Sequence, residues 1–310
     1  MNELGRIKLW KTILRNMNES AVLKEEIIKK ETALSKTNPD VKTILNALYL
    51  DEDRELSFQR YCASHEFKIL FNEIARNIGG NRNAKICEIG AGPGFLAAAL
   101  AKSGFKNISI LEPNSAWTTG TGFIASSGHK YGVHVWNSLN DWYASDELYD
   151  LIITRACVHH FDNVSKVAAE IRCKINSDGR WLMFDEYFAN TPEELYAALA
   201  THAHVVKYGQ YEWPYSASLY VELMSLVGFK LIEVLPNRYE NNYIARNISN
   251  DVRFTKIVTI ASKILVRLKM TVFAFRIEKF IYSFFNPKRR FFTLPQLFVF
   301  KLSKIIYPSV

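Results

Sequence analysis

Hydrophobic and polar positions follow two different periods along this chain of 310 residues. Up to residue 80, apolar residues recur every three or four positions, which predicts helices, and Ser57 is expected to begin one that runs to Ile78. After Gly79 and Gly80, short apolar runs alternate with helical segments. This alternation predicts an α/β fold, in which a mostly parallel sheet carries helices on both faces.

The expected elements divide the chain into three parts. Strands are expected at 84–89, 108–111, 133–136, 148–154, 181–184 and 229–235, and helices at 95–103, 164–175 and 216–227. The turn residues Ser177, Asp178 and Gly179 precede the fifth of these strands. The three parts are an N-terminal helical cap (1–80), a central domain (81–245) and a basic, aromatic-rich helical tail (246–310).

A glycine-rich segment joins the first expected strand to the next helix, and it reads Glu88-Ile89-Gly90-Ala91-Gly92-Pro93-Gly94. Glycines let the backbone turn tightly and approach a ligand, and the helix N-terminus offers free N–H groups beside it. The carboxylate of Glu88 suits a cationic amino group and would repel a pyrophosphate. Glu112 closes the second strand, where it could accept hydrogen bonds from both hydroxyls of a ribose. The alternative is an ordinary strand-to-helix turn followed by a solvated strand end.

With these residues the sequence resembles the class I S-adenosylmethionine-dependent methyltransferases, in their small-molecule branch, over about residues 60–240. The resemblance implies a Rossmann-like fold with S-adenosylmethionine as cofactor. It places the methionine and ribose portion at Glu88, Gly90, Gly92 and Gly94, and the ribose hydroxyls at Glu112. A polar residue after the third strand often meets the adenine in this family. Asn137 stands at that position, where an Asp is more usual.

Two histidines, His159 and His160, follow the fourth expected strand, in a hydrophobic-His-His pattern that is common in the resembled family. Ligands of open parallel sheets bind at the carboxyl ends of the strands, so a histidine here could take a proton from a substrate hydroxyl. A packing role is the alternative. Further along, ring-bearing side chains predict either an aromatic wall for the acceptor or simple helix packing. They are His202, His204, Tyr208, Tyr211, Trp213 and Tyr215.

The positive charge is concentrated near the end of the chain. Residues 252–310 hold 12 Lys/Arg and one acid, Glu278, for a net charge of +11, whereas the other residues hold 27 Lys/Arg and 30 Asp/Glu, for −3. Basic and aromatic residues interleave there, without the roughly 18–20 apolar residues that span a bilayer. We expect this segment to bind an anionic membrane surface. Packing against the body or a second subunit is the next alternative, and nucleic acid is the least favoured partner.

The sequence therefore predicts an S-adenosylmethionine-dependent methyltransferase that acts on a small-molecule or lipid-linked acceptor, at oxygen. Its four cysteines lie far apart, which predicts free thiols, no metal site and a cytoplasmic protein. The basic tail adds the expectation that this protein is peripheral on the membrane. One alternative is an RNA methyltransferase whose tail binds the RNA backbone. Another is a methyltransferase-like binding protein without turnover, although the presence of Glu88 and Glu112 argues against it.

Overall fold

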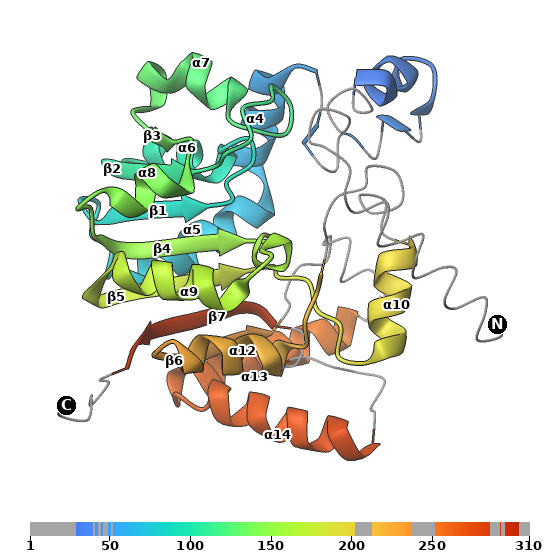
Figure 1. Ribbon diagram of the computed structural model, residues 1–310. Helices are drawn as coiled ribbons and strands as arrows, with labels where there is room; N and C mark the ends of the chain where they lie inside the picture. The colour runs from blue at the N-terminus through green and yellow to red at the C-terminus, as the bar shows by residue number, and fades with distance from the viewer. Residues whose placement is uncertain are drawn as a thin grey trace. The chain divides into compact units, whose positions relative to one another are not determined.

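The computed structural model describes residues 29–39, 41–42, 45, 49–50, 52–201, 213–236, 252–285, 292 and 295–303. The chain forms two compact units, Met1–Ser145 with Thr191–Trp213, and Asp146–Asn190 with Pro214–Val310. The strands are β1 (Lys85–Ile89), β2 (Asn107–Leu111), β3 (His134–Trp136), β4 (Tyr149–Arg155), β5 (Ile175–Phe184), β6 (Phe229–Pro236) and β7 (Pro295–Leu302). Their order across the sheet is β3-β2-β1-β4-β5-β7-β6, and helices lie on both sides of the strands (Figure 1). The predicted Rossmann-like, mostly parallel fold is thereby confirmed.

In the first unit, three parallel strands form one continuous ladder. Ile89 of β1, Leu111 of β2 and Trp136 of β3 lie in a single row across it. Helix α6 (Phe95–Lys102) follows the glycine segment and packs on β2, with residues 95–100 buried. Helix α7 (Gly122–Tyr131) lies between β2 and β3 in the chain, and helix α8 (Leu139–Ala144) follows β3. The three loops that follow Ile89, Leu111 and Trp136 therefore begin at the same edge of the sheet.

Between residues 54 and 77, the structure has two helices where the sequence predicted one. Helix α4 (Arg54–Ala63) ends at Ser64, and α5 (His65–Asn77) begins there. Ser64 is extended, and its side chain accepts a hydrogen bond from the Phe67 N–H, so it caps the second helix. The predicted start at Ser57 is therefore wrong, because Ser57 is buried inside α4. Residues 29–35 are also helical, and the helices predicted within residues 1–28 lie outside the described residues.

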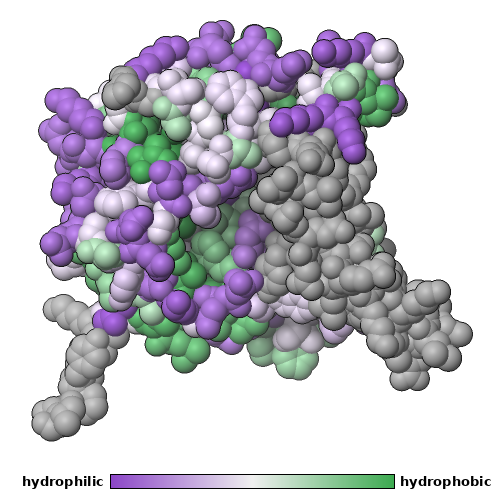
Figure 2. Space-filling model, turned by 45° about the horizontal axis from the view of Figure 1, so that its top comes forward, coloured by the Kyte–Doolittle hydropathy of each residue, from purple (hydrophilic) through white to green (hydrophobic). Residues whose placement is uncertain are grey.

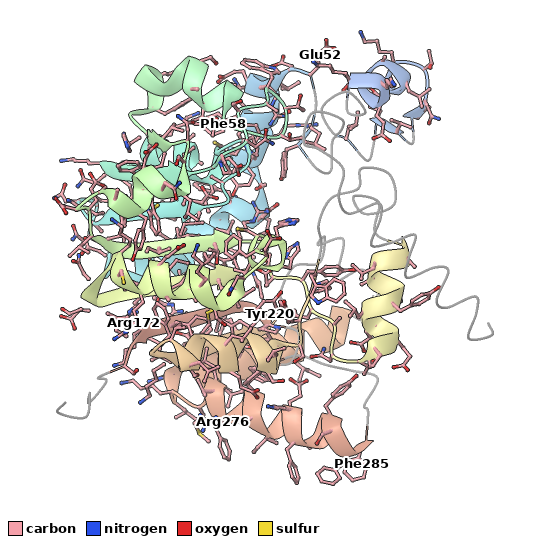
Figure 3. All side chains as sticks on the ribbon, viewed as in Figure 1. Glu52, Phe58, Arg172, Tyr220, Arg276 and Phe285 are labelled. Carbon is pink, nitrogen blue, oxygen red and sulfur yellow. The ribbon has the colours of Figure 1, made fainter. Side chains whose placement is uncertain are left out.

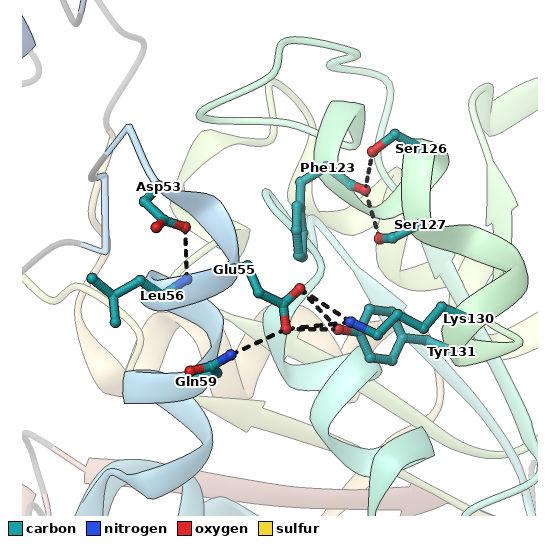
Figure 4. Close-up of polar contacts among 9 residues, drawn as sticks. All are labelled: Asp53, Glu55, Leu56, Gln59, Phe123, Ser126, Ser127, Lys130 and Tyr131. Atoms are coloured by element: carbon teal, nitrogen blue, oxygen red, sulfur yellow. Dashed lines mark hydrogen bonds and ion pairs between the residues drawn. The ribbon is translucent and has the colours of Figure 1, made fainter.

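Helix α4 is attached to α7 by polar and aromatic contacts (Figure 4). The carboxylate of Glu55 accepts hydrogen bonds from Lys130 Nζ and from the Tyr131 hydroxyl, both at 3.3 Å. Beneath this pair, the fully buried ring of Phe58 packs 5.6 Å from the ring of Phe95 and 6.2 Å from that of Phe123. Helix α4 is thus part of the core of the first unit.

In the second unit, β4 and β5 are parallel, and helices α9 (Val164–Cys173) and α12 (Ala217–Leu226) contact each other. Strand β5 is longer than predicted, because residues 177–179 belong to it and form no turn between elements. The register shifts there, from Tyr149 opposite Ile175 to Leu151 opposite Arg180. The extra residues form an irregularity in the strand, as bulges do.

The predicted helical tail is helical only in part. Helices α13 (Val252–Arg267) and α14 (Thr271–Phe285) are followed by β7, which lies antiparallel between β5 and β6. Residues 297–300 of β7 are essentially inaccessible to solvent. The sheet therefore extends beyond the predicted central domain at 81–245, and the helical pair is an insertion between β6 and β7. Helix α10 (Pro192–Thr201) was not predicted either. None of the helices in the described part of the chain has the length and apolar content needed to cross a bilayer.

Candidate functional site

The glycine segment adopts a backbone conformation that other residues rarely take. Gly90, Gly92 and Gly94 have φ angles of 67°, 52° and 70°, in the left-handed region. At Gly94 a Cβ atom would also lie 2.7 Å from Cγ1 of Ile124, which is too close. At Gly92 a Cβ would make only an ordinary contact with the Thr119 carbonyl oxygen at 3.6 Å, so the backbone angle alone requires glycine there. The backbone angle therefore favours glycine at all three positions, and close packing against α7 also requires it at Gly94.

Glu112 connects this loop to the segment after β2. The Gly92 N–H donates to its Oε2 at 2.8 Å, and the Asn114 N–H donates to its Oε1 at 2.9 Å. The side chain is half-buried, and each carboxylate oxygen can accept more than one hydrogen bond. The position therefore suits a ligand that brings two neighbouring hydroxyl groups.

Glu88 is buried, and it caps helix α6. Its Oε2 accepts a hydrogen bond from the Ala97 N–H at 3.1 Å, while Gly94 at the N-cap position has no side chain to do so. The pKa of Glu88 is raised to about 8, chiefly by burial; the Ala97 N–H lowers it, and the nearby carboxylate of Glu112 raises it. No cation is among these causes. A cationic amino group placed here would stabilise the ionised form, so the carboxyl group fits such a ligand.

Asn137 is exposed directly after β3. It follows Trp136, whose carbonyl oxygen accepts a hydrogen bond from the Glu112 N–H at 3.1 Å. Gly90, Glu112 and Asn137 thus begin at the same edge, directly after the row of Ile89, Leu111 and Trp136. The structure brings the predicted cofactor residues together within the first unit. Their donors and acceptors suit a ligand with a ribose and an ammonium group.

In the second unit, His159 and Glu186 form a buried pair. Nδ1 of His159 contacts Oε1 of Glu186. The Glu186 carboxylate also accepts hydrogen bonds from the Val158 N–H at 2.9 Å and the Tyr187 N–H at 3.1 Å. Burial raises the pKa of Glu186, but the imidazole and these N–H groups outweigh it and hold the pKa below its ordinary value. A carboxylate that contacts Nδ1 fixes the orientation of the imidazole ring, so that Nε2 points away from Glu186.

His160 is half-buried, and its ring centroid lies 4.1 Å from that of His159, with the two planes tilted by 44°. Nearby, Ala156 and Asp185 have φ angles of 44° and 49°, which are unusual for residues with a side chain. They follow β4 and β5 directly. Burial raises the pKa of Asp185 to about 6, although Arg155, 3.4 Å away, lowers it. Strained backbone of this kind is concentrated at functional sites.

From the sequence, no role was assigned to Glu186. In the sequence, Glu186 is marked only as a carboxylate after the fifth strand. Its partner, His159, lies 27 residues earlier in the chain. Of the predicted aromatic wall, residues 202–211 lie outside the described residues. Trp213 and Tyr215 are half-buried, and the ring of Tyr215 packs 5.5 Å from that of Tyr220. No cluster of three or more His, Cys, Asp or Glu side chains suited to a metal occurs in the described part.

Comparison with known proteins gives the family. A family model described as a methyltransferase domain matches residues 62–234, more than half of the chain. A ubiquinone biosynthesis O-methyltransferase of Rickettsia conorii is 27% identical over 114 residues, which are 37% of this chain and 36% of that protein. The uncharacterized methyltransferase YcgJ of Bacillus subtilis is 25% identical over 108 residues, 35% of this chain and 43% of that protein. The matches thus span less than half the length of these curated relatives.

Among solved structures, a candidate sarcosine dimethylglycine methyltransferase from Galdieria sulphuraria has a TM-score of 0.50 and 16% sequence identity. The match covers 78% of this chain and 85% of that one. At this identity, the likeness concerns the fold.

Proposed function

The chain belongs to the methyltransferase-domain family, and from this premise we propose that it transfers a methyl group from S-adenosylmethionine to a hydroxyl oxygen of a small-molecule or lipid-linked acceptor. Membership confirms the class I S-adenosylmethionine-dependent family predicted from the glycine segment, and S-adenosylmethionine is the cofactor of that family. The acceptor and the acceptor atom are the proposed part.

The observation that carries the proposal is the hydrogen bond from the Gly92 N–H to Glu112, beside the buried carboxyl group of Glu88. S-adenosylmethionine supplies a methyl group on a sulfonium, which needs no further activation. The protein therefore has to hold the cofactor and position the acceptor. In our proposal Glu112 accepts hydrogen bonds from the ribose hydroxyls, Glu88 faces the amino group, and Asn137 accepts from the adenine amino group through its carbonyl oxygen.

We assign proton removal from the acceptor to the histidine pair. With Nδ1 of His159 directed at Glu186, Nε2 is the atom that would take the proton, and the Glu186 carboxylate would stabilise the resulting imidazolium. Glu186 is then a positioning residue, because it acts through His159. His160 is the second candidate base, and it is the more accessible of the two.

One relative supports a lipid-linked acceptor hydroxyl. It is named as an O-methyltransferase of ubiquinone biosynthesis, but it matches only part of this chain. We propose the cytoplasm as the location, partly at a membrane surface. Among the described residues, no disulfide joins Cys62, Cys87, Cys157 or Cys173, which is in keeping with a reducing compartment.

A methyl-transfer assay tests the proposal. Purified protein and labelled S-adenosylmethionine would be incubated with lipid, small-molecule and RNA fractions of a cell extract, each scored separately. We expect label in the lipid or small-molecule fraction, in a base-stable linkage typical of an ether. Label in RNA alone would refute the proposed acceptor. Failure of the protein to bind S-adenosylmethionine in calorimetry would refute the cofactor site itself.

A further inference from the structure

The insertion between β6 and β7 exposes a large apolar surface. On α13, exposed apolar residues recur at spacings of three and four, so they share one face of the helix. They are Ile257, Ile260, Ile264 and Leu268, the last directly after the helix ends. Ser262, on another side of the helix, is fully buried. The helix therefore packs through one side and leaves its apolar side exposed.

Helix α14 repeats this arrangement with larger side chains. Thr271 and Phe275 are buried, and Val234 of β6 donates its N–H to the Thr271 hydroxyl at 3.2 Å. The exposed residues lie on other sides of the helix, and they are Phe273, Ile277, Phe280, Ile281, Phe284 and Phe285. Phe280 is 64% and Phe285 78% exposed. Figure 3 shows Phe285 at the end of α14, on the side away from the strands of this unit, and Figure 2 shows hydrophobic residues at the lower edge of its view.

Cations border these apolar faces. Lys263, Arg267 and Lys269 are exposed on and just after α13, and Arg276 is exposed on α14. The one acid of the segment, Glu278, is half-buried and accepts a hydrogen bond from the Phe292 N–H. The exposed apolar residues of α13 and α14 are therefore flanked by positive charge, which the single acid of these two helices does not balance.

We infer that α13 and α14 form a membrane-binding surface whose partner is an anionic lipid bilayer. Exposed Phe and Ile side chains enter the boundary between headgroups and acyl chains, while Lys and Arg remain at the phosphate level. A second copy of this chain is disfavoured, because two such faces would bring like charges together. Single-stranded RNA is disfavoured, because six of the ten exposed apolar residues named above are aliphatic and offer no ring for bases to stack on.

The inference narrows the sequence prediction, which assigned the whole of 252–310 to the membrane. Phe298 and Phe300 are fully buried in β7 and take no part. Rather than a trailing tail, the surface is a helical pair anchored between two strands. It deepens the proposed function, since it would bring the enzyme to an acceptor that remains in the bilayer, but binding itself does not depend on methyl transfer.

Vesicle co-sedimentation of the full chain tests the inference. Vesicles of phosphatidylcholine with roughly one third phosphatidylglycerol are compared with phosphatidylcholine alone, at low and high salt. We expect binding to the anionic vesicles only, weakened by salt. Phe280→Ser with Phe284→Ser should lower the partition coefficient at least about tenfold. Lys263→Gln with Arg276→Gln should lower it about 30-fold at low salt, at about fivefold per charge.

Two matched controls separate the surface from general effects. Leu226→Ser removes an apolar side chain that is 81% exposed on α12, and Lys106→Gln removes an exposed charge in the first unit. Both should bind vesicles as the parent does, and thermal unfolding checks that every variant folds. The inference is wrong if the parent ignores anionic vesicles at low salt or if the double Phe variant binds unchanged. It is also wrong if sedimentation reveals a dimer that this variant abolishes. Calorimetry with S-adenosylmethionine on the same samples shows whether the cofactor site fails independently.

Discussion

The buried carboxyl group of Glu88 offers the sharpest test of the cofactor site. Its pKa is raised from the ordinary value of 4.5 to about 8, chiefly by burial. At about 1.4 kcal/mol per pKa unit, this difference corresponds to at most about 5 kcal/mol of unfolding free energy. Because the pKa in the folded state is the higher one, the stabilisation is fully present below pH 4.5 and is lost as the pH rises through about 8.

The variant Glu88→Gln isolates this effect, because its amide oxygen still accepts from the Ala97 N–H but carries no charge. Urea unfolding without cofactor should show the parent losing several kcal/mol relative to this variant between about pH 5 and about pH 8.5. Other groups, including Asp185, titrate in both proteins and cancel in the comparison. Glu193→Gln, at an exposed position, should leave the pH profile of the parent unchanged. Parallel profiles for the parent and Glu88→Gln would refute the reasoning.

The same carboxyl group links the pH effect to the ligand. A ligand ammonium group beside Glu88 would favour the ionised form, so binding at pH 7 should release a proton. Calorimetry of S-adenosylhomocysteine in buffers of different ionisation enthalpy measures that release. We expect it in the parent and not in Glu88→Gln. Equal proton release in both proteins would place the amino group elsewhere.

The remaining predictions concern the loop, the ribose contact and the histidine pair. Glu112→Ala should weaken S-adenosylmethionine binding in calorimetry by roughly 1.5–3 kcal/mol, because the ribose loses a charged acceptor. Gly94→Ala should lower the unfolding temperature, because the new Cβ clashes with an isoleucine of α7 and the φ angle is unfavourable. His159→Ala or His160→Ala should lower kcat by about 10²–10⁴-fold with cofactor affinity unchanged, and normal turnover in both would exclude them. Glu186→Gln should lower kcat less and shift the kcat–pH profile, because the imidazolium loses its carboxylate.

The cofactor loop could be predicted because its signals are local. The glycines, the strand before them and the helix after them lie within a few residues of one another, and the required φ angles leave little choice of residue. Glu112 is separated from Gly92 by 20 residues, but it directly follows the next strand, so the parallel order of the two strands was enough to predict its place beside the loop. The capping of α6 by Glu88 was not predicted, since it depends on how the strand lies against the helix.

The errors share a different cause. Strand β7 is paired with β5 and with β6, and both partners are distant in sequence, so no local pattern marked it as central. The break at Ser64 rests on one side-chain hydrogen bond within an otherwise helical pattern. The role of Glu186 depends on the ends of β4 and β5 lying together, where four backbone N–H groups and an imidazole meet one carboxylate. In each case tertiary packing decided what the local sequence left open.

The position of the insertion explains how one chain can carry both a nearly neutral body and a strongly basic segment. Pro236 at the end of β6 pairs with Pro295 at the start of β7, so the two ends of the insertion meet at adjacent strands. Closing a long loop at a fixed separation adds little entropic cost per added residue, so a helical pair can be inserted there while the sheet keeps its register. Because β7 must still return between β5 and β6, the insertion is anchored at both ends. In the proposed membrane-binding role, a surface anchored in this way would transmit the orientation of the bilayer to the sheet, which a flexible trailing tail would not do.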